Sequence, residues 1–304
     1  MSNWTTNQMP DQNKRVAIVT GANSGLGYET SRALAEKGAI VIMACRNLQN
    51  GRAALDKIQS QHPNATLELM MLDVSSLDSV RQFVATFREK YDRLDMLINN
   101  AGVMMIPERR ETVDGFEMQF GTNHLGHFAL TGLLLDILLK TGDARIVSVS
   151  SVAHQRGRID FDDLNAQKSY NPTSAYGQSK LANLLFTYEL QRRLEKSGSS
   201  CIAAAAHPGW TATNLQRYSG FFRVLNPILG QGIDMGALPT LYAATASDVQ
   251  GGDYYGPGGF MGMHGYPKKV ASSEGSHDRD VAARLWDVSE QLTGVTYEFS
   301  LSVK

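Results

Sequence analysis

Residues 15–27 have the sequence RVAIVTGANSGLG, an apolar run that ends in a glycine-rich turn and leads into a helical pattern. The run is continuous rather than alternating, which is typical of a parallel strand covered by helices on both faces. Similar apolar runs recur downstream, separated by stretches with helical periodicity. This alternation of strands and helices predicts a doubly wound parallel sheet.

The whole chain follows this alternation. We expect strands at residues 15–20, 40–44, 67–71, 94–98, 145–149 and 200–205, and helices at 25–37, 48–60, 77–90, 116–140, 174–196 and 278–292. No Pro/Gly/Ser-rich linker divides these elements, so the expected fold is α/β, of the Rossmann type, in a single domain. The predicted boundaries are a polar N-terminal tail at 1–13, the domain at 14–294 and a C-terminal tail at 295–304.

Residues 211–233 are predicted to form a small apolar lid over the substrate. The segment is too apolar for a solvated loop and too broken by glycine and proline for a long helix. Core packing or a subunit interface would require the same side chains, and their spacing does not separate these alternatives. The apolar residues are Tyr218, Phe221, Phe222, Val224, Leu225, Ile228 and Leu229, with Phe260 and Met261 in a later glycine-rich stretch.

Composition excludes several classes of protein. The 304 residues are 42% hydrophobic and 19% charged, which provides enough apolar surface for a large core. The formal net charge is -1, so no basic excess is available to neutralise a nucleic-acid backbone, and we expect no such partner. Cys45 and Cys201 are too few for a disulfide framework or a metal shell.

The N-terminus lacks the apolar region of a signal peptide, and no apolar run approaches the length of a membrane span. We therefore expect a cytoplasmic protein without membrane attachment. The sequence leaves open whether it forms a homo-oligomer.

The glycine-rich turn predicts a phosphate-binding site. Glycines at this position permit a tight turn and let the backbone approach a pyrophosphate, while the following helix presents free N–H groups. Three residues separate Gly21 from Gly25, a variant of the usual dinucleotide-binding spacing. A purely structural connection is the alternative, but the position after the first strand of a doubly wound chain favours the cofactor.

The end of the second expected strand predicts which cofactor binds. Chains that bind NAD usually place an acidic residue there, on the ribose 2′-hydroxyl. This chain has Arg46 and no acid. A guanidinium pairs with a 2′-phosphate, which a carboxylate would repel, so NADP(H) is favoured over NAD.

Three groups downstream carry candidate chemistry. The sequence Asn99-Asn100-Ala101-Gly102 follows the fourth strand, Ser150-Ser151 closes the fifth, and Tyr176 and Lys180 lie four positions apart on a helix. Residues at this spacing share a helix face. A phenol has a pKa near 10 and works as an acid or base at neutral pH only when cations lower that value; Lys180 and a positive nicotinamide are candidates for this effect.

In this order and spacing, the motifs resemble the single-domain short-chain dehydrogenase/reductases over roughly residues 14–294. Asp73-Val74, Asn123 and the segment that begins His207-Pro208-Gly209 belong to the same pattern. Three segments look like the branch that contains retinol dehydrogenases and WW-domain oxidoreductases: ACR at 44–46, TNHLGHF at 122–128 and SKLAN at 179–183.

The resemblance implies a role for each matching residue. It makes Tyr176 the general acid/base, Ser151 the holder of the substrate oxygen and Lys180 the residue that binds the nicotinamide ribose and lowers the tyrosine pKa. Asn123 would support a water relay. Because Ser151 and Tyr176 are 25 positions apart, more than in many members, a contribution from Ser150 stays open. The implied cofactor-binding residues are Gly21, Asn23, Ser24, Gly25, Leu26, Gly27, Arg46, Asp73, Val74, Asn100, Ala101, Gly102, Tyr176, Lys180, Pro208, Gly209, Thr211 and Thr213.

The sequence thus predicts an NADP(H)-dependent oxidoreductase that acts on a small-molecule carbonyl or alcohol and reduces a bulky apolar ketone or aldehyde. An NADP-binding redox sensor without turnover is one alternative, but it would not need Ser151, Tyr176 and Lys180. A nucleotide-sugar epimerase or dehydratase is another, for which the 91 residues after Thr213 leave little room. The histidines lack zinc-like ligand spacing, so we expect no metal.

Overall fold

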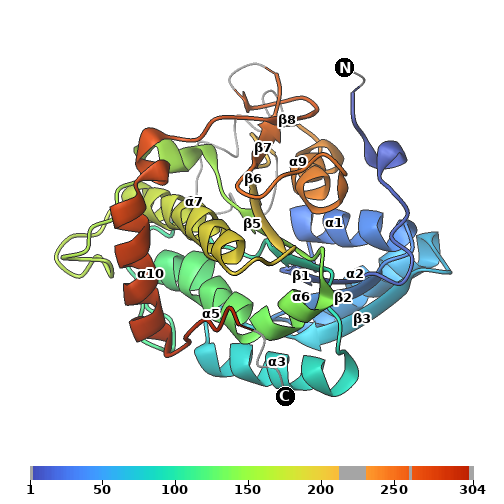
Figure 1. The fold of residues 1–304 in the computed structure, drawn as a ribbon, viewed down its shortest axis with the longest axis horizontal. Helices are drawn as coiled ribbons and strands as arrows, with labels where there is room; N and C mark the ends of the chain where they lie inside the picture. Colours follow the sequence, from blue (N-terminus) through green and yellow to red (C-terminus); the bar gives the residue numbers. More distant parts are fainter. Residues whose placement is uncertain (1–2, 212–230, 260–261, 301–304) are drawn as a thin grey trace.

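The chain folds around one mostly parallel sheet with helices on both faces (Figure 1). The structure is a computed structural model and describes residues 3–211, 231–259 and 262–300. In this part of the chain the strand order is β3-β2-β1-β4-β5-β6-β7-β8, and only the β7–β8 pair is antiparallel. The strands are β1 (Val16–Thr20), β2 (Ile40–Cys45), β3 (Thr66–Met71), β4 (Met96–Asn99), β5 (Arg145–Val149), β6 (Ile202–Ala206), β7 (Tyr254–Pro257) and β8 (Pro267–Lys269).

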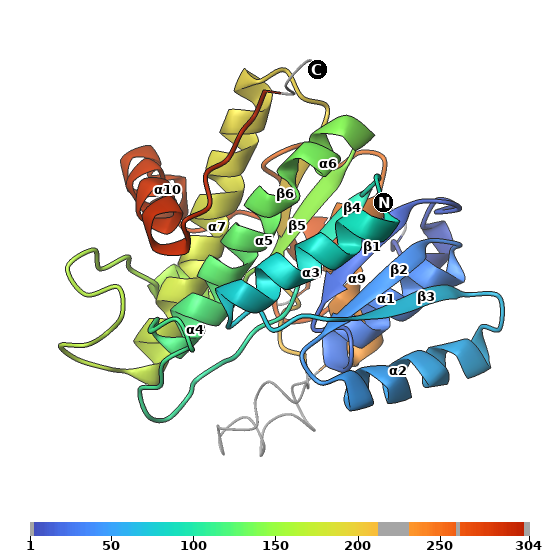
Figure 2. The same cartoon turned by 90° about the horizontal axis from the view of Figure 1, so that it is seen from below.

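The helices form two layers. One layer consists of α1 (Gly25–Glu36), α2 (Leu48–Gln61) and α9 (Ile233–Thr245). The other consists of α3 (Leu77–Lys90), α5 (Gly126–Leu133), α6 (Leu135–Thr141), α7 (Pro172–Lys196) and α10 (Arg279–Thr293). Helix α10 packs on α5 and α7 and lies on the opposite side of the molecule from α2 (Figure 2). This arrangement is the expected Rossmann-type α/β fold in a single domain.

Both faces of the sheet are buried, which explains why its strands are continuously apolar. In β1, Ile18 belongs to the apolar cluster that includes α3, α5 and α7, whereas Ala17 and Val19 belong to the cluster that includes α1, α2 and α9. All five residues of this strand are buried. Because a buried Val or Ile side chain contributes about 1.5–3 kcal/mol, an apolar residue at every position stabilises both layers at once.

The structure departs from the sequence expectations in two regions. Strand β7, strand β8 and helix α9 were not expected: β7 lies in the glycine-rich stretch, and α9 contains Pro239. The helix expected at 116–140 is divided. It consists of a short α-helical turn at Met118–Phe120, a π-helical turn at Gly121–Leu125, α5, a break at Leu134 and α6.

Parts of both expected tails pack on the domain. Trp4 makes an edge-to-face contact with Tyr242, with ring centroids 5.0 Å apart, and Met9 is buried. Near the other end, the Tyr297 hydroxyl donates a hydrogen bond of 2.6 Å to the Phe128 carbonyl. Most of the predicted lid, residues 212–230, lies outside the described residues, as do Phe260 and Met261. None of the helices described here is both long and apolar enough to cross a membrane.

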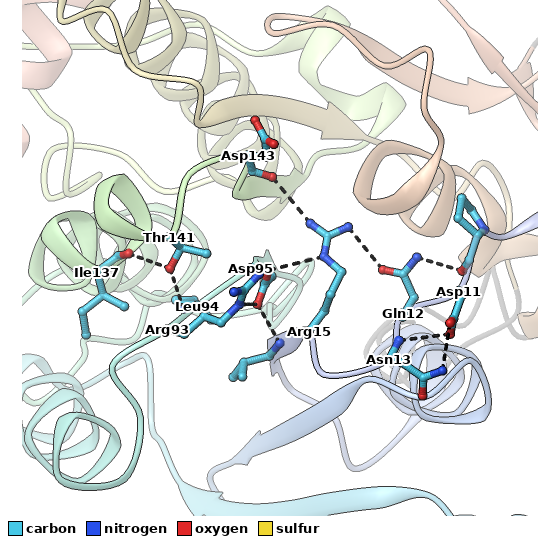
Figure 3. Close-up of polar contacts among 12 residues, drawn as sticks. Asp11, Gln12, Asn13, Arg15, Arg93, Leu94, Asp95, Ile137, Thr141 and Asp143 are labelled. Carbon is cyan, nitrogen blue, oxygen red and sulfur yellow. Dashed lines mark hydrogen bonds and ion pairs between the residues drawn. The ribbon is translucent and has the colours of Figure 1, made fainter.

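A buried carboxylate joins β1 and β4 at the amino ends of these strands. Asp95 accepts hydrogen bonds from the Val16 amide at 2.9 Å and from Arg93 at 2.7 Å, while Arg15 approaches at 3.4 Å (Figure 3). Burial alone would raise the pKa of Asp95, but the hydrogen bonds from Arg93 and Val16 and the two positive charges outweigh it and lower the pKa. The charged form of Asp95 therefore stabilises the folded state.

We predict that Asp95→Asn lowers the free energy of unfolding at neutral pH by about 1–3 kcal/mol, because it removes the acceptor charge from a buried network. Since the folded pKa lies below the ordinary value of 3.8, this stabilisation is present above that value and is lost as the pH falls through the folded pKa. Urea unfolding at neutral pH and at about pH 3 measures both effects.

Asp143→Asn is the matched control, because Asp143 is exposed and contacts Arg15 only through its main-chain oxygen. We expect this variant to match the wild type at both pH values. An Asp95→Asn protein that loses as much stability on acidification as the wild type would contradict the assignment.

Candidate active site

A cavity of about 310 Å³ opens at the carboxyl ends of the strands on one side of the sheet. It lies between the β1–α1 turn, the ends of β2 and β3, and the segment after β4. This is where ligands bind in open α/β sheets. The lining residues are Thr20, Gly21, Asn23, Ser24, Gly25, Leu26, Gly27, Ala44, Arg46, Asn47, Asn50, Leu72, Asp73, Val74, Asn100, Ala101, Gly102, Val103 and Thr122.

The glycine turn provides a close backbone cradle. Gly21 and Gly25 have φ angles of +68° and +55°, a region that favours glycine. A Cβ atom on Gly27 would lie 2.4 Å from the Gly21 oxygen and 2.6 Å from the Asn100 amide nitrogen. Helix α1 can therefore begin against the turn only because Gly27 has no side chain. Its first N–H groups border the cavity, the position in which a pyrophosphate is bound.

The part of the cavity next to the end of β2 is lined, among the residues that the structure describes, by a positively charged residue and no acidic one. Arg46, Asn47 and Asn50 follow this strand and line the cavity, and Arg46 is exposed and has no ion pair with the described residues. Asp73 lines the cavity after β3, where its carboxylate accepts hydrogen bonds from the Ser75 amide and hydroxyl at 3.0 and 2.6 Å. Together with the glycine turn, this lining fits a dinucleotide cofactor.

A second group of polar residues lies beyond the segment that follows β4. Tyr176 and Lys180 are both 4% exposed on α7, and the Lys180 ammonium is 5.8 Å from the Tyr176 ring centroid. The ammonium donates to the Val149 carbonyl at 2.9 Å. It also lies near Gly102, where a Cβ atom would be 3.8 Å away. The Lys180 ammonium therefore lies next to a residue that lines the cavity, although neither Tyr176 nor Lys180 is itself among the lining residues.

Burial dominates the protonation of this pair. It raises the pKa of Tyr176 to about 12, although the neighbouring Ser151 hydroxyl offsets part of the effect. It also lowers the pKa of Lys180 to about 8. In the protein alone, burial is thus the dominant influence on the tyrosine pKa. A lowering of this pKa by Lys180 together with a positive nicotinamide stays a prediction.

The two adjacent serines have different environments. Ser150 is 2% exposed, and its hydroxyl donates to the Lys180 carbonyl at 2.8 Å. Ser151 is partly exposed beside Tyr176 and caps the short 3₁₀ helix at Val152–Arg156. Of the two, Ser151 has the hydroxyl that can reach a ligand next to Tyr176.

Asn123 is fully buried in the π-helical turn, and its side-chain amide has protein partners on both atoms. Its oxygen accepts from the Val103 amide at 2.8 Å, and its nitrogen donates to the Val103 carbonyl and the Ser179 hydroxyl, both at 2.9 Å. This side chain therefore fixes the segment after β4, and only its main-chain carbonyl could take part in the implied water relay.

Close main-chain contacts and hydrogen bonds hold the loop after β6. Gly209 has a φ angle of +63°, and a Cβ atom there would lie 2.3 Å from the Met263 oxygen. The Pro208 carbonyl accepts hydrogen bonds from Thr211 at 2.7 Å and from Gln231 at 2.8 Å. Pro208, Gly209 and Thr211 are not among the residues that line the cavity, and Thr213 lies outside the described residues.

Several lining residues escaped the sequence analysis. Asn47 and Asn50 carry amides at the start of α2. They follow Arg46 closely in the sequence, so the prediction made for Arg46 could have been extended to them. Thr20, Ala44, Leu72, Val103 and Thr122 also line the cavity, but nothing in the residue types indicates this. In the described part of the chain, no group of three or more His, Cys, Asp or Glu residues could hold a metal ion.

Comparison with known sequences identifies the family. Residues 15–220 match the family described as short chain dehydrogenase. The chain belongs to this family. Its members bind a nicotinamide cofactor and act on alcohols or carbonyls, and the cavity is the candidate site for the dinucleotide.

The relatives support the retinol dehydrogenase branch that the motifs indicated. Human retinol dehydrogenase 13 is 44% identical over 92% of this chain and 85% of its own length. Polyprenol dehydrogenase of Danio rerio is 42% identical over 94% and 89%, respectively.

Solved structures have the same fold. An uncharacterized protein from Mycobacterium paratuberculosis is 45% identical, covers 99% of this chain and all of its own, and has a TM-score of 0.81. A short chain dehydrogenase from Shigella flexneri, solved with NADP, is 24% identical with a TM-score of 0.67; 81% of this chain and 98% of that chain are covered.

We predict that Lys180→Met raises the free energy of unfolding of the cofactor-free dehydrogenase at neutral pH, by on the order of 3 kcal/mol. The folded pKa of about 8 lies below the ordinary value of 10.5, so the unfolded chain binds more protons between these values. The cost of the buried ammonium is full below about 8 and is relieved as the pH rises through this window. The difference between variant and wild type should therefore shrink.

Denaturant unfolding at intervals across this pH range provides the measurement. Lys196→Met is the control on the same helix, because Lys196 is exposed, and it should leave the pH dependence unchanged. A constant difference between Lys180→Met and the wild type would rule out a shifted lysine.

Proposed function

We propose that this short chain dehydrogenase uses NADP(H) to transfer hydride between the nicotinamide and a carbonyl or alcohol, and that it reduces a bulky, mostly apolar ketone or aldehyde. The observation that carries the proposal is the group formed by Tyr176, Lys180 and Ser151, whose Lys180 ammonium lies beside Gly102 of the cavity. A redox sensor has no need of this acid/base group, and the relatives are dehydrogenases rather than epimerases.

The side chains would share the work of the reduction. When bound, the nicotinamide supplies a hydride to the carbonyl carbon, and negative charge develops on the oxygen. The Ser151 hydroxyl would donate a hydrogen bond to that oxygen, and the Tyr176 hydroxyl would transfer its proton to it. Lys180 would bind the cofactor ribose and stabilise the resulting phenolate electrostatically. A phenol with a raised pKa remains protonated until this step.

We propose NADP(H) over NAD(H) because of charge at the end of β2. The exposed guanidinium of Arg46 can pair with a 2′-phosphate in two parallel hydrogen bonds. The Asn47 and Asn50 amides beside it line the same end of the cavity and can add further hydrogen bonds.

We predict that Arg46→Asp weakens NADPH binding at least about tenfold and makes NADH the preferred cofactor, because the new carboxylate repels a phosphate and accepts from a ribose hydroxyl. Fluorescence titration of both cofactors into both proteins provides the dissociation constants. Arg52→Asp adds the same charge at an exposed position on α2 that does not line the cavity, and it should retain the preference. A wild-type preference for NADH would overturn this choice of cofactor.

The proposed substrate class is supported by the relatives. Retinol dehydrogenase 13 and polyprenol dehydrogenase are named for long apolar alcohols. The apolar residues of 212–230 were the sequence argument for the same class. A panel of ketones and aldehydes, with retinaldehyde and long-chain aldehydes at one end and aldoses and a triose phosphate at the other, tests it. Activity confined to the small polar compounds would overturn the substrate class.

We predict that Tyr176→Phe lowers kcat on the best substrate of this panel by about 10²–10⁴-fold, because the ring remains while the transferable proton is lost. NADPH affinity should change little. Tyr188→Phe is the matched control: it removes a hydroxyl from the same helix, one that bonds Ser272 instead, and it should retain activity. Turnover by Tyr176→Phe near the wild-type rate would show that another group supplies the proton.

A further inference from the structure

His127 connects the cofactor turn to the π-helical turn. It is 3% exposed at the start of α5. Its Nδ1 atom lies 3.0 Å from the Asn123 carbonyl, and its Nε2 atom lies 2.9 Å from the Thr20 hydroxyl. The two contacts come from opposite edges of one ring, so the imidazole bridges the end of β1 and the bulge in the helix.

The partners determine where the ring proton lies. A carbonyl only accepts, so Nδ1 carries the proton and donates to Asn123. Nε2 of a neutral ring is then an acceptor. The Thr20 oxygen already accepts from the Asn100 and Ala101 amides at 2.9 and 2.8 Å, so its own hydrogen is free to donate to Nε2. The Ile98 carbonyl is a longer alternative at 3.3 Å.

Protonation of the His127 ring would break this series of hydrogen bonds. A proton on Nε2 would point at a hydroxyl oxygen whose two acceptor positions are taken by main-chain amides. Burial lowers the pKa of His127 to about 4, and the charge of Lys180 contributes to the effect, although the hydrogen bond to the Asn123 carbonyl opposes it. The neutral state therefore agrees with the geometry.

We propose that His127, as the neutral Nδ1-protonated ring, is a positioning residue that holds the dinucleotide cradle and the acid/base group in one fixed relation. Thr20 lines the cavity and holds the turn that follows β4. The side-chain amide of Asn123 bonds the main chain of Val103, the residue after Gly102, and Gly102 lies beside the Lys180 ammonium. This inference rests on the proposed function, because the proposed function assigns the roles of the two sites that the hydrogen bonds connect, the dinucleotide cradle and the acid/base group.

His124, in the π-helical turn just before α5, provides a matched control. It is 2% exposed, and its Nε2 atom lies 2.9 Å from the Ser289 hydroxyl of α10. That hydroxyl donates to the Leu285 carbonyl at 2.7 Å, so His124 donates to it and is directed away from the cavity. A leucine here removes a buried imidazole from the same helix without touching the Thr20–Asn123 chain.

The first test compares variants by their NADPH dissociation constant and kcat, with circular dichroism as the check on folding. We expect His127→Leu to raise the dissociation constant and lower kcat, each by at least about tenfold, because buried polar groups lose their partner. His127→Gln keeps an acceptor near Thr20 and should recover most of the NADPH affinity. His124→Leu should remain within about threefold of the wild type in both quantities. Wild-type values in His127→Leu, or equal losses in His124→Leu, would overturn the proposal.

The second test measures the ring proton directly and does not require that the leucine variant folds. In ¹⁵N-histidine-labelled wild type without cofactor, the His127 nitrogen shifts should be those of a neutral ring protonated on Nδ1, and Thr20→Val should move the Nε2 shift. Protonation on Nε2 would overturn the proposal. A wild type that binds no NADPH and reduces no carbonyl would contradict the proposed function instead, and the nitrogen shifts would still decide the hydrogen-bond chain.

Discussion

The site depends on the hydroxyl of Thr20, the last residue of β1. This single oxygen accepts the Asn100 and Ala101 amides at 2.9 and 2.8 Å, and so ties the turn after β4 to the start of the glycine turn. Both segments line the cavity. Parallel strands leave N–H groups unpaired at their carboxyl ends, and a buried N–H without a partner is costly. The Thr20 hydroxyl thus accepts from both amides, of which that of Asn100 also bonds the Ile98 carbonyl at 3.0 Å, and it links the two walls of the candidate dinucleotide site.

Buried ionisable groups differ between the amino and carboxyl edges of the sheet. At the amino edge, Asp95 has several donors and its pKa is lowered, so its charge stabilises the fold (Figure 3). At the carboxyl edge, Lys180 and Tyr176 are buried with few partners, and burial moves both pKa values away from their charged forms. Such an arrangement destabilises the protein alone but suits a site that meets a charged ligand and moves a proton. The stabilising charge lies at the amino edge of the sheet, and the proposed acid/base group lies at the carboxyl edge.

The sequence alone determined where six strands lie along the chain, the glycine turn, Arg46 at the end of β2 and the Tyr176–Lys180 pair. Each of these depends on interactions within a few residues: apolar periodicity, the freedom of glycine to adopt positive φ, or the spacing of one helix turn. Such local patterns can be recognised without knowledge of how the rest of the chain folds. Together with the motif order, they also identified the family.

Only the tertiary structure decided which of Ser150 and Ser151 lies beside Tyr176, that Tyr176 is buried so that its pKa is raised in the protein alone, and that the helix expected at 116–140 contains a π-helical turn. It also added β7, β8 and α9. These features depend on partners far away in the sequence: the His127 ring bonds Thr20 across 107 positions, and β7 joins the sheet by pairing with β6, from which helix α9 separates it in the sequence. A local pattern cannot contain that information, because burial and hydrogen-bond partners are set only when distant segments pack together.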